Sequence, residues 1–126
     1  MHESGEMYLE TILVLGMKRN MVRSIDVAEE MGYSKASVSR AMNILKKDEC
    51  VVVNSQGYIA LTEKGRAIAE MIYSRHKLLT AVLEGIGVDA DTAEADACRI
   101  EHYISDTTFE AMEKCVKAYP EFFEAK

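Results

Sequence analysis

Three side chains in the second half of the sequence, Cys98, Glu101 and His102, offer three different metal donors within five residues. They stand at positions i, i+3 and i+4, so a helix through this stretch would place them on one face. A thiolate, a carboxylate and an imidazole together suit a divalent transition metal. Because three donors on one helix rarely complete a metal shell, this pattern predicts further ligands from other parts of the chain.

Further donors occur at two earlier places in the sequence. Met7 and Glu10 share a helix face at i and i+3 near the N-terminus, and His76 lies mid-chain. Each candidate also has an ordinary structural role. Met7 could fill a gap in the core, Cys98 could be a small buried thiol, His76 a hydrogen-bonded helix residue and Glu10 a solvated carboxylate. Their spacing alone leaves both interpretations open.

The composition is that of a globular protein in a reducing compartment. The chain has 126 residues, 48% of them apolar and 29% charged, which allows one medium domain or two very small ones. No apolar run approaches the roughly 18 residues of a membrane span, and the first residues lack the basic and apolar regions of a signal peptide. Three cysteines are an odd number for a disulfide framework. We therefore expect a cytoplasmic protein without a membrane segment.

The charge is distributed unevenly along the chain. The formal net charge is −6, but residues 1–66 hold nine basic and nine acidic residues, whereas residues 67–126 hold six and twelve. The net negative charge of the chain thus comes entirely from residues 67–126. Because residues 1–66 have no net charge, this half can contain a nucleic-acid-binding surface despite the negative total.

Helix signals in the first half resemble a helix-turn-helix. Residues 4–19, 24–31 and 34–47 predict three helices, capped by Ser4, Ser24 and Ser34, with Gly32 as the stop of the second. The third has an apolar stripe and four basic residues without an acidic one, which favours a recognition helix in the DNA major groove. A helical hairpin with a solvated charged face is the alternative. The predicted DNA-binding residues are Ser34, Lys35, Ala36, Ser37, Ser39, Arg40, Asn43 and Lys47.

The segment after the third helix favours the DNA-binding interpretation. Residues 50–61 contain two short β-branched or apolar runs around an Asn-Ser-Gln-Gly turn, which predicts a β-hairpin, or wing. A long helix over residues 62–85, capped by Thr62, should follow. We expect two more helices, one over 91–104 capped by Asp91 and one from 105 to about 119, and a short tail over 121–126. The fold class is mainly α with a small β-hairpin wing.

In this order, the elements and motifs resemble the metal-dependent transcriptional repressors of the diphtheria toxin repressor (iron) and manganese transport regulator type. The matching stretches are Glu6-Met7-Tyr8-Leu9, Val27-Ala28-Glu29, Ser37-Val38-Ser39, Leu61-Thr62-Glu63-Lys64-Gly65-Arg66, Arg75-His76 and Cys98-Arg99-Ile100-Glu101-His102. The resemblance implies a winged helix-turn-helix DNA-binding domain at 1–66, and an all-helical dimerisation and metal-binding domain at 67–126. It also implies that the first helix contributes metal ligands.

The resemblance implies a mixed ligand set. Residues at the positions of Met7, Cys98, Glu101 and His102 are ligands in the iron branch. The manganese branch has a carboxylate at the first of these and a glutamate at the second, and it uses residues at the positions of Glu10 and His76 in an adjacent second site. Because a thioether and a thiolate do not suit Mn(II), Fe(II) is favoured and Mn(II) is the second choice.

The sequence thus predicts a homodimeric, metal-responsive repressor that binds a double-stranded DNA operator and is not an enzyme. Two rivals remain. One is a winged-helix regulator that senses a small organic ligand or redox state through Cys98. The other is a metalloenzyme, which would need an open coordination position beside a general base. Only Glu10 is left for that role, and an enzyme would not need a basic helix with a wing.

Overall fold

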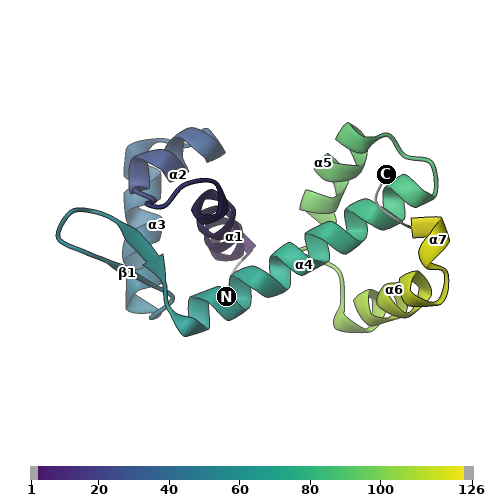
Figure 1. The fold of residues 1–126 in the computed structure, drawn as a ribbon. Coiled ribbons are helices and arrows are strands. Elements are labelled where there is room, and N and C mark those ends of the chain that lie inside the picture. Colours follow the sequence, from purple (N-terminus) through teal and green to yellow (C-terminus); the bar gives the residue numbers. More distant parts are fainter. Residues whose placement is uncertain (1–2, 124–126) are drawn as a thin grey trace. The chain divides into compact units, whose positions relative to one another are not determined.

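The structure is a computed structural model that describes residues 3–123 (Figure 1). The chain divides into two compact units, Met1–Met71 and Ile72–Lys126, and the boundary falls inside the longest helix. The elements are α1 (Glu3–Lys18), α2 (Ser24–Met31), α3 (Lys35–Lys47), β1 (Val51–Val53), β2 (Ile59–Leu61), α4 (Glu63–Gly85), α5 (Ala90–Ile100), α6 (Asp106–Ala118) and α7 (Pro120–Phe123). The predicted class, mainly helical with one hairpin, is confirmed. No helix among residues 3–123 is both long and apolar enough to cross a membrane.

The core of the N-terminal unit is formed by the apolar stripes of three helices and one face of the hairpin. Each fully buried aliphatic side chain contributes about 1.5–3 kcal/mol relative to an exposed one. The buried residues at the centre are Leu9, Ile12 and Leu15 of α1, Val27 of α2, Val38, Met42 and Leu45 of α3, and Val51 and Ile59 of the hairpin. Because Val38, Met42 and Leu45 are buried on one face of α3, the opposite, polar face of this helix is exposed.

The ends of α2 and α3 are fixed by local hydrogen bonds. Gly32 ends α2 with φ +70°, a left-handed conformation that favours glycine. Ser34 caps α3 by accepting a hydrogen bond from the Ser37 N–H at 3.1 Å. Ser24 was predicted to cap α2, and that was wrong. Arg23 is the cap, and its backbone N–H donates to the Asp26 carboxylate at 2.8 Å.

The hairpin is tied to the start of α4 by a close backbone approach. Strands β1 and β2 are antiparallel, with Val51 opposite Leu61. The Thr62 N–H donates to the Cys50 carbonyl at 3.0 Å, and the Thr62 hydroxyl accepts from the Gly65 N–H at 3.0 Å. A Cβ at Gly65 would lie 1.9 Å from the Cys50 carbonyl oxygen. Glycine is therefore required here by contact, and Thr62 caps α4 as predicted.

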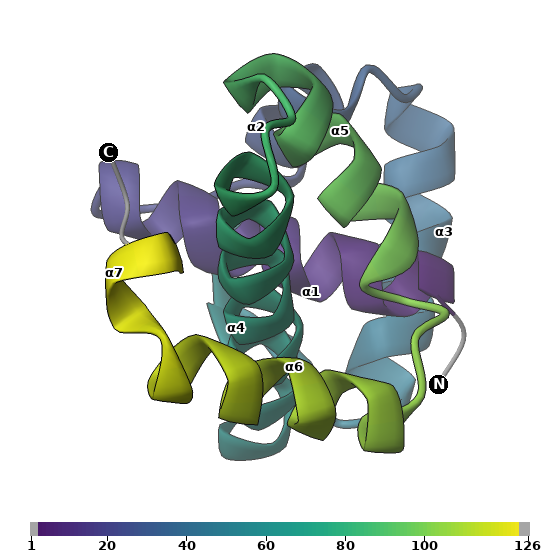
Figure 2. The same ribbon diagram turned by 90° about the vertical axis from the view of Figure 1, so that its right-hand side faces the viewer.

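In the C-terminal unit, the later half of α4 runs among α5, α6 and α7 (Figure 2). Asp89 caps α5 by accepting from the Thr92 N–H, and these hydrogen bonds lower the pKa of the Asp89 carboxyl. Two predicted boundaries were wrong. The fifth helix ends at Ile100, because residues 101–103 form a turn, and Pro120 begins a short helix where a tail was expected. The rest of that predicted tail, 124–126, lies outside the described residues.

Candidate metal centre and nucleic-acid interface

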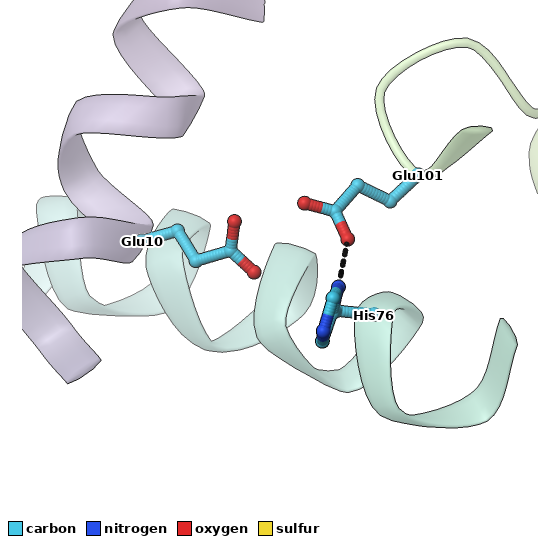
Figure 3. Close-up of side chains that lie close together, drawn as sticks. All are labelled: Glu10, His76 and Glu101. Carbon is cyan, nitrogen blue, oxygen red and sulfur yellow. Dashed lines mark hydrogen bonds and ion pairs between the residues drawn. The ribbon is translucent and has the colours of Figure 1, made fainter. Parts of the chain in front are cut away.

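A buried carboxylate between two imidazoles is the centre of the candidate metal site. The Glu101 side chain is wholly buried, with an exposed fraction of 0%. Its Oε2 lies 2.8 Å from His76 Nδ1, and the two side chains point toward each other in Figure 3. Its Oε1 lies 3.3 Å from Nε2 of His102, whose side chain is 3% exposed. The C-terminal unit thus brings three of the six predicted ligands together.

The chemistry of this cluster fits a divalent cation. Removing a carboxylate from water costs several kcal/mol unless charge or hydrogen bonds compensate. Among the described residues, no group donates a hydrogen bond to Glu101 Oε1. A cation held there would receive one carboxylate and two imidazoles, a donor set common to Mn(II), Fe(II), Co(II) and Zn(II).

Cys98 lies outside this buried cluster. The prediction that Cys98, Glu101 and His102 share one continuous helix face was wrong, since α5 ends at Ile100. The buried stripe of α5 runs through Ala93 and Ala97 to Glu101 at four-residue steps. Cys98 follows Ala97 by one residue, about 100° around the helix, and its side chain is exposed.

Met7 and Glu10 lie on α1 in the N-terminal unit, one turn apart and half-buried. Between them Tyr8 packs edge-on against Tyr33, with ring centroids 6.1 Å apart. Burial raises the pKa of the Tyr8 hydroxyl, Tyr33 raises it further, and Arg40 lowers it. Tyr8 therefore stays neutral at physiological pH, and its uncharged ring holds this part of α1 in the N-terminal core.

Sequence reasoning missed Arg75, which precedes His76 on α4. Its guanidinium is buried, donates to the Ile104 carbonyl at 3.0 Å, and pairs with the Asp106 carboxylate. Its Cζ also lies 5.2 Å from the centre of the Phe109 ring. The only sequence signal was an arginine next to a candidate ligand in the Arg-His pair, and no periodicity indicates which residues it contacts.

The polar face of α3 is available as a nucleic-acid interface. Of the eight predicted contact residues, seven are exposed and Ser37 is half-buried. Ser34, Ser37 and Arg40 form a hydrogen-bonded chain, with the Ser34 hydroxyl 3.0 Å and Arg40 Nη2 3.4 Å from Ser37 Oγ. The guanidinium is therefore held beside the N-terminal turn of α3, the part of a recognition helix that meets base edges.

A second arginine near the hairpin was not predicted. Arg23 forms an isolated bridge with Tyr58, its Nη2 donates to the tyrosine hydroxyl at 3.1 Å, and its Cζ lies 4.6 Å from the ring centre. The wing is thereby fixed to the start of α2. Its tip is held by Asn54, whose side-chain oxygen accepts from the N–H groups of Gln56 and Tyr58.

A winged helix-turn-helix with a buried carboxylate–imidazole cluster in its helical second unit defines a class, the metal-dependent winged-helix regulators. Residues 1–59 match the family model described as iron dependent repressor, N-terminal DNA binding domain. Residues 62–122 match the iron dependent repressor, metal binding and dimerisation domain. The chain belongs to the iron-dependent repressor family. It is accordingly a metal-responsive, DNA-binding transcriptional repressor.

Relatives and solved structures agree with this assignment. The chain is 32% identical to the HTH-type transcriptional regulator MntR of Geobacillus kaustophilus, over 94% of this chain and 84% of that one. It is 34% identical to the MntR of Bacillus velezensis, over 81% of this chain and 72% of that one. The manganese regulator SloR matches at TM-score 0.79 and 27% identity, and a manganese-dependent transcriptional repressor in complex with manganese at 0.83 and 25%. Each structure covers 90% of this chain, which spans only 53% and 52% of theirs.

Proposed function

We propose that this protein is a cytoplasmic homodimeric repressor, without enzymatic activity, whose operator affinity is raised by Fe(II) or Mn(II) and which controls genes of metal homeostasis. The observation that carries the proposal is the wholly buried Glu101 carboxylate, with one oxygen 2.8 Å from His76 and the other 3.3 Å from His102. In a regulator that binds no cation here, the buried carboxylate would only lower stability, because removing its charge from water costs free energy.

The proposed ligands are the six residues predicted from the sequence. His76, Glu101 and His102 would supply the buried set, Met7 and Glu10 of α1 would add a thioether and a carboxylate, and Cys98, which is exposed beside that set, would add a thiolate. A bound divalent ion would supply a cross-link between side chains that are distant in sequence. Donor chemistry and the family's metal-binding domain support this set.

The metal proposal favours Fe(II). The carboxylates and imidazoles suit both Fe(II) and Mn(II), whereas the sulfur atoms of Met7 and Cys98 suit Fe(II) better. The named regulators similar to this chain are manganese regulators, so Mn(II) is the competing choice. The sulfur donors are the residues on which the preference depends.

The proposed dimer contact lies on α6. None of the described residues of α6 is buried, and Phe109, Met112 and Val116 of its apolar stripe are half-covered. A second copy would cover that stripe, as the family's dimerisation domain implies. In a two-fold dimer, metal would hold the two α3 helices at the ~34–36 Å spacing of successive major grooves, with two-way coupling between metal and DNA affinity.

The direct test is DNA selection with and without metal under anoxic conditions. Chelated protein is mixed with a random duplex pool, in chelator, with Fe(II) or with Mn(II), and bound sequences are recovered. We expect enrichment of a two-fold sequence only with metal. Metal-dependent anisotropy with the recovered duplex then gives the activation midpoint for each ion.

Two results would overturn the proposal. Equal enrichment in chelator and in metal would remove the switch. Enrichment that instead follows added oxidant, and disappears in Cys98→Ser, would favour the redox rival. The metal content of protein purified anoxically identifies the ion held in the cell.

Metal preference should depend on the two sulfur donors. In the double variant Met7→Asp/Cys98→Glu the proposed ligands are all oxygen and nitrogen, so activation should shift from Fe(II) toward Mn(II). The measurement is the ratio of Fe(II) to Mn(II) midpoints for binding the selected duplex. Cys115→Ser, which removes another exposed thiol, is the matched control. An unchanged ratio in the double variant would show that these residues do not set selectivity.

Arg40 should contribute directly to operator recognition. Arg40→Ala is expected to weaken binding of the selected duplex by about 1–3 kcal/mol if the side chain pairs with a guanine. Arg99→Ala removes another exposed guanidinium, from α5, and should leave affinity unchanged. Gel-shift titration at fixed salt and saturating metal measures both. Wild-type affinity in Arg40→Ala would remove this residue from the interface.

A further inference from the structure

The segment that carries Glu101 and His102 leaves α5 at Glu101, the C-cap residue, whose backbone N–H still donates to the Ala97 carbonyl at 2.9 Å. It follows the last turn of α5 and precedes α6 (Figure 2), and its first three residues form a turn. Within it, the Tyr103 and Ile104 N–H groups return to the Ile100 carbonyl at 2.9 and 3.0 Å. Local hydrogen bonds therefore shape the turn without attaching it to α4, where His76 lies.

Two consecutive residues of α4 make that attachment. His76 contacts the start of the segment through Glu101 at 2.8 Å, and Arg75 contacts its end through the Ile104 carbonyl and the Asp106 carboxylate. The Phe109 ring, 5.2 Å from Cζ, packs near the same guanidinium. Arg75 is thus the contact that fixes residues 101–106 to α4 without offering a metal donor of its own.

A purely stabilising role explains this arginine poorly. Its side chain is 11% exposed, and no hydrogen-bond partner of its buried Nε is found among the described residues. The Asp106 carboxylate that it pairs with is 84% exposed, and an ion pair with a solvent-exposed partner contributes little to stability. Two directed, charge-assisted hydrogen bonds do provide something that an apolar residue cannot, because they fix the position of the groups that accept them.

We propose that Arg75 is a positioning residue that sets the geometry of Glu101 and His102 toward His76, and so tunes metal affinity and coordination. The inference rests on the proposed function of this site. Substitution of residues just outside a metal shell typically lowers affinity 10–100-fold. We expect an effect of that size at Arg75.

The test uses Co(II) as a spectroscopic probe in the full-length reduced protein. Arg75→Gln should weaken Co(II) binding about 10–100-fold and change the intensity of the visible d–d bands. Arg75→Lys should lie between Arg75→Gln and wild type, since one ammonium cannot reproduce the guanidinium fork. Arg99→Gln, on an exposed arginine of α5 that lies 3.8 Å from Asp96, should match wild type in both readouts.

A merely structural Arg75 would give a different pattern. Arg75→Gln would then lower the unfolding midpoint of the chelated protein, yet leave the Co(II) spectrum and affinity of the folded protein unchanged, and this result would overturn the inference. If Arg75→Gln does not fold, Asp106→Asn takes its place, because that carboxylate is 84% exposed. It should weaken Co(II) binding several-fold and change the spectrum, and wild-type behaviour would again overturn the inference. Wild-type protein that binds no Co(II) would refute the proposed metal function instead.

Discussion

Glu101→Gln is expected to abolish metal-dependent DNA binding while the protein folds and dimerises as wild type. The amide has nearly the same size as the carboxylate, so the buried volume stays filled and hydrogen bonding to His76 remains available. The charge that offsets a cation is lost. Since outer-shell changes already reduce metal affinity by up to ~100-fold, loss of this anionic ligand should reduce it at least as much.

The chelated form of Glu101→Gln gives the decisive comparison. A buried carboxylate destabilises the metal-free protein unless its charge is compensated, so the glutamine variant in chelator should be at least as stable as wild type. Thermal unfolding with and without metal measures this. Wild type should gain stability from metal through binding linkage, whereas the variant should gain almost none. Glu110→Gln, an exposed glutamate of α6, is the matched control.

One result with Glu101→Gln would contradict the metal interpretation. If Glu101→Gln activates on the selected duplex at the wild-type metal midpoint, the buried cluster is structural. Sensing by another ligand would then become the better account of the switch.

Gly65→Ala is expected to destabilise the N-terminal unit by about 3 kcal/mol, the upper end of the usual cost of overpacking. Helix propensity alone would favour alanine by about 1 kcal/mol. Contact decides the sign, because the new Cβ would lie 1.9 Å from the Cys50 carbonyl oxygen. A backbone atom held by the hydrogen bond from the Thr62 N–H cannot move away cheaply.

Gly16→Ala is the control for this prediction. Gly16 lies in α1, and among the described residues no atom beyond its chain neighbours and its own helix backbone lies within 4 Å of the place that a Cβ would take, so alanine should stabilise by about 1 kcal/mol. Urea unfolding of both variants, followed by circular dichroism, measures the two changes. Equal effects of the same sign would show that the approach of α4 to β1 does not constrain position 65.

Local signals in the sequence determined the helical elements and the hairpin. Ser34, Gly32 and Thr62 fix helix ends through atoms only a few residues away, so their chemistry can be recognised without a tertiary structure. The apolar stripe of α3 likewise determined which face is buried, and thus which face is exposed for DNA. The cap of α5 was missed by two residues because several neighbouring polar side chains could each serve. The cap of α2 was missed by one residue because its N-terminus is fixed through the Asp26 carboxylate, which accepts from the Arg23 N–H.

Tertiary structure decided which donors meet and which do not. Glu101 and Cys98 are three residues apart, yet one is wholly buried and the other exposed, because α5 buries a narrow stripe and ends before Glu101. His76 reaches Glu101 across 25 residues of sequence. The contacts of Arg75 with Ile104, Asp106 and Phe109 likewise join residues that are distant in sequence. Contacts of this kind depend on how helices pack against one another, and a periodic pattern records only that a face is buried, not which residues lie opposite it.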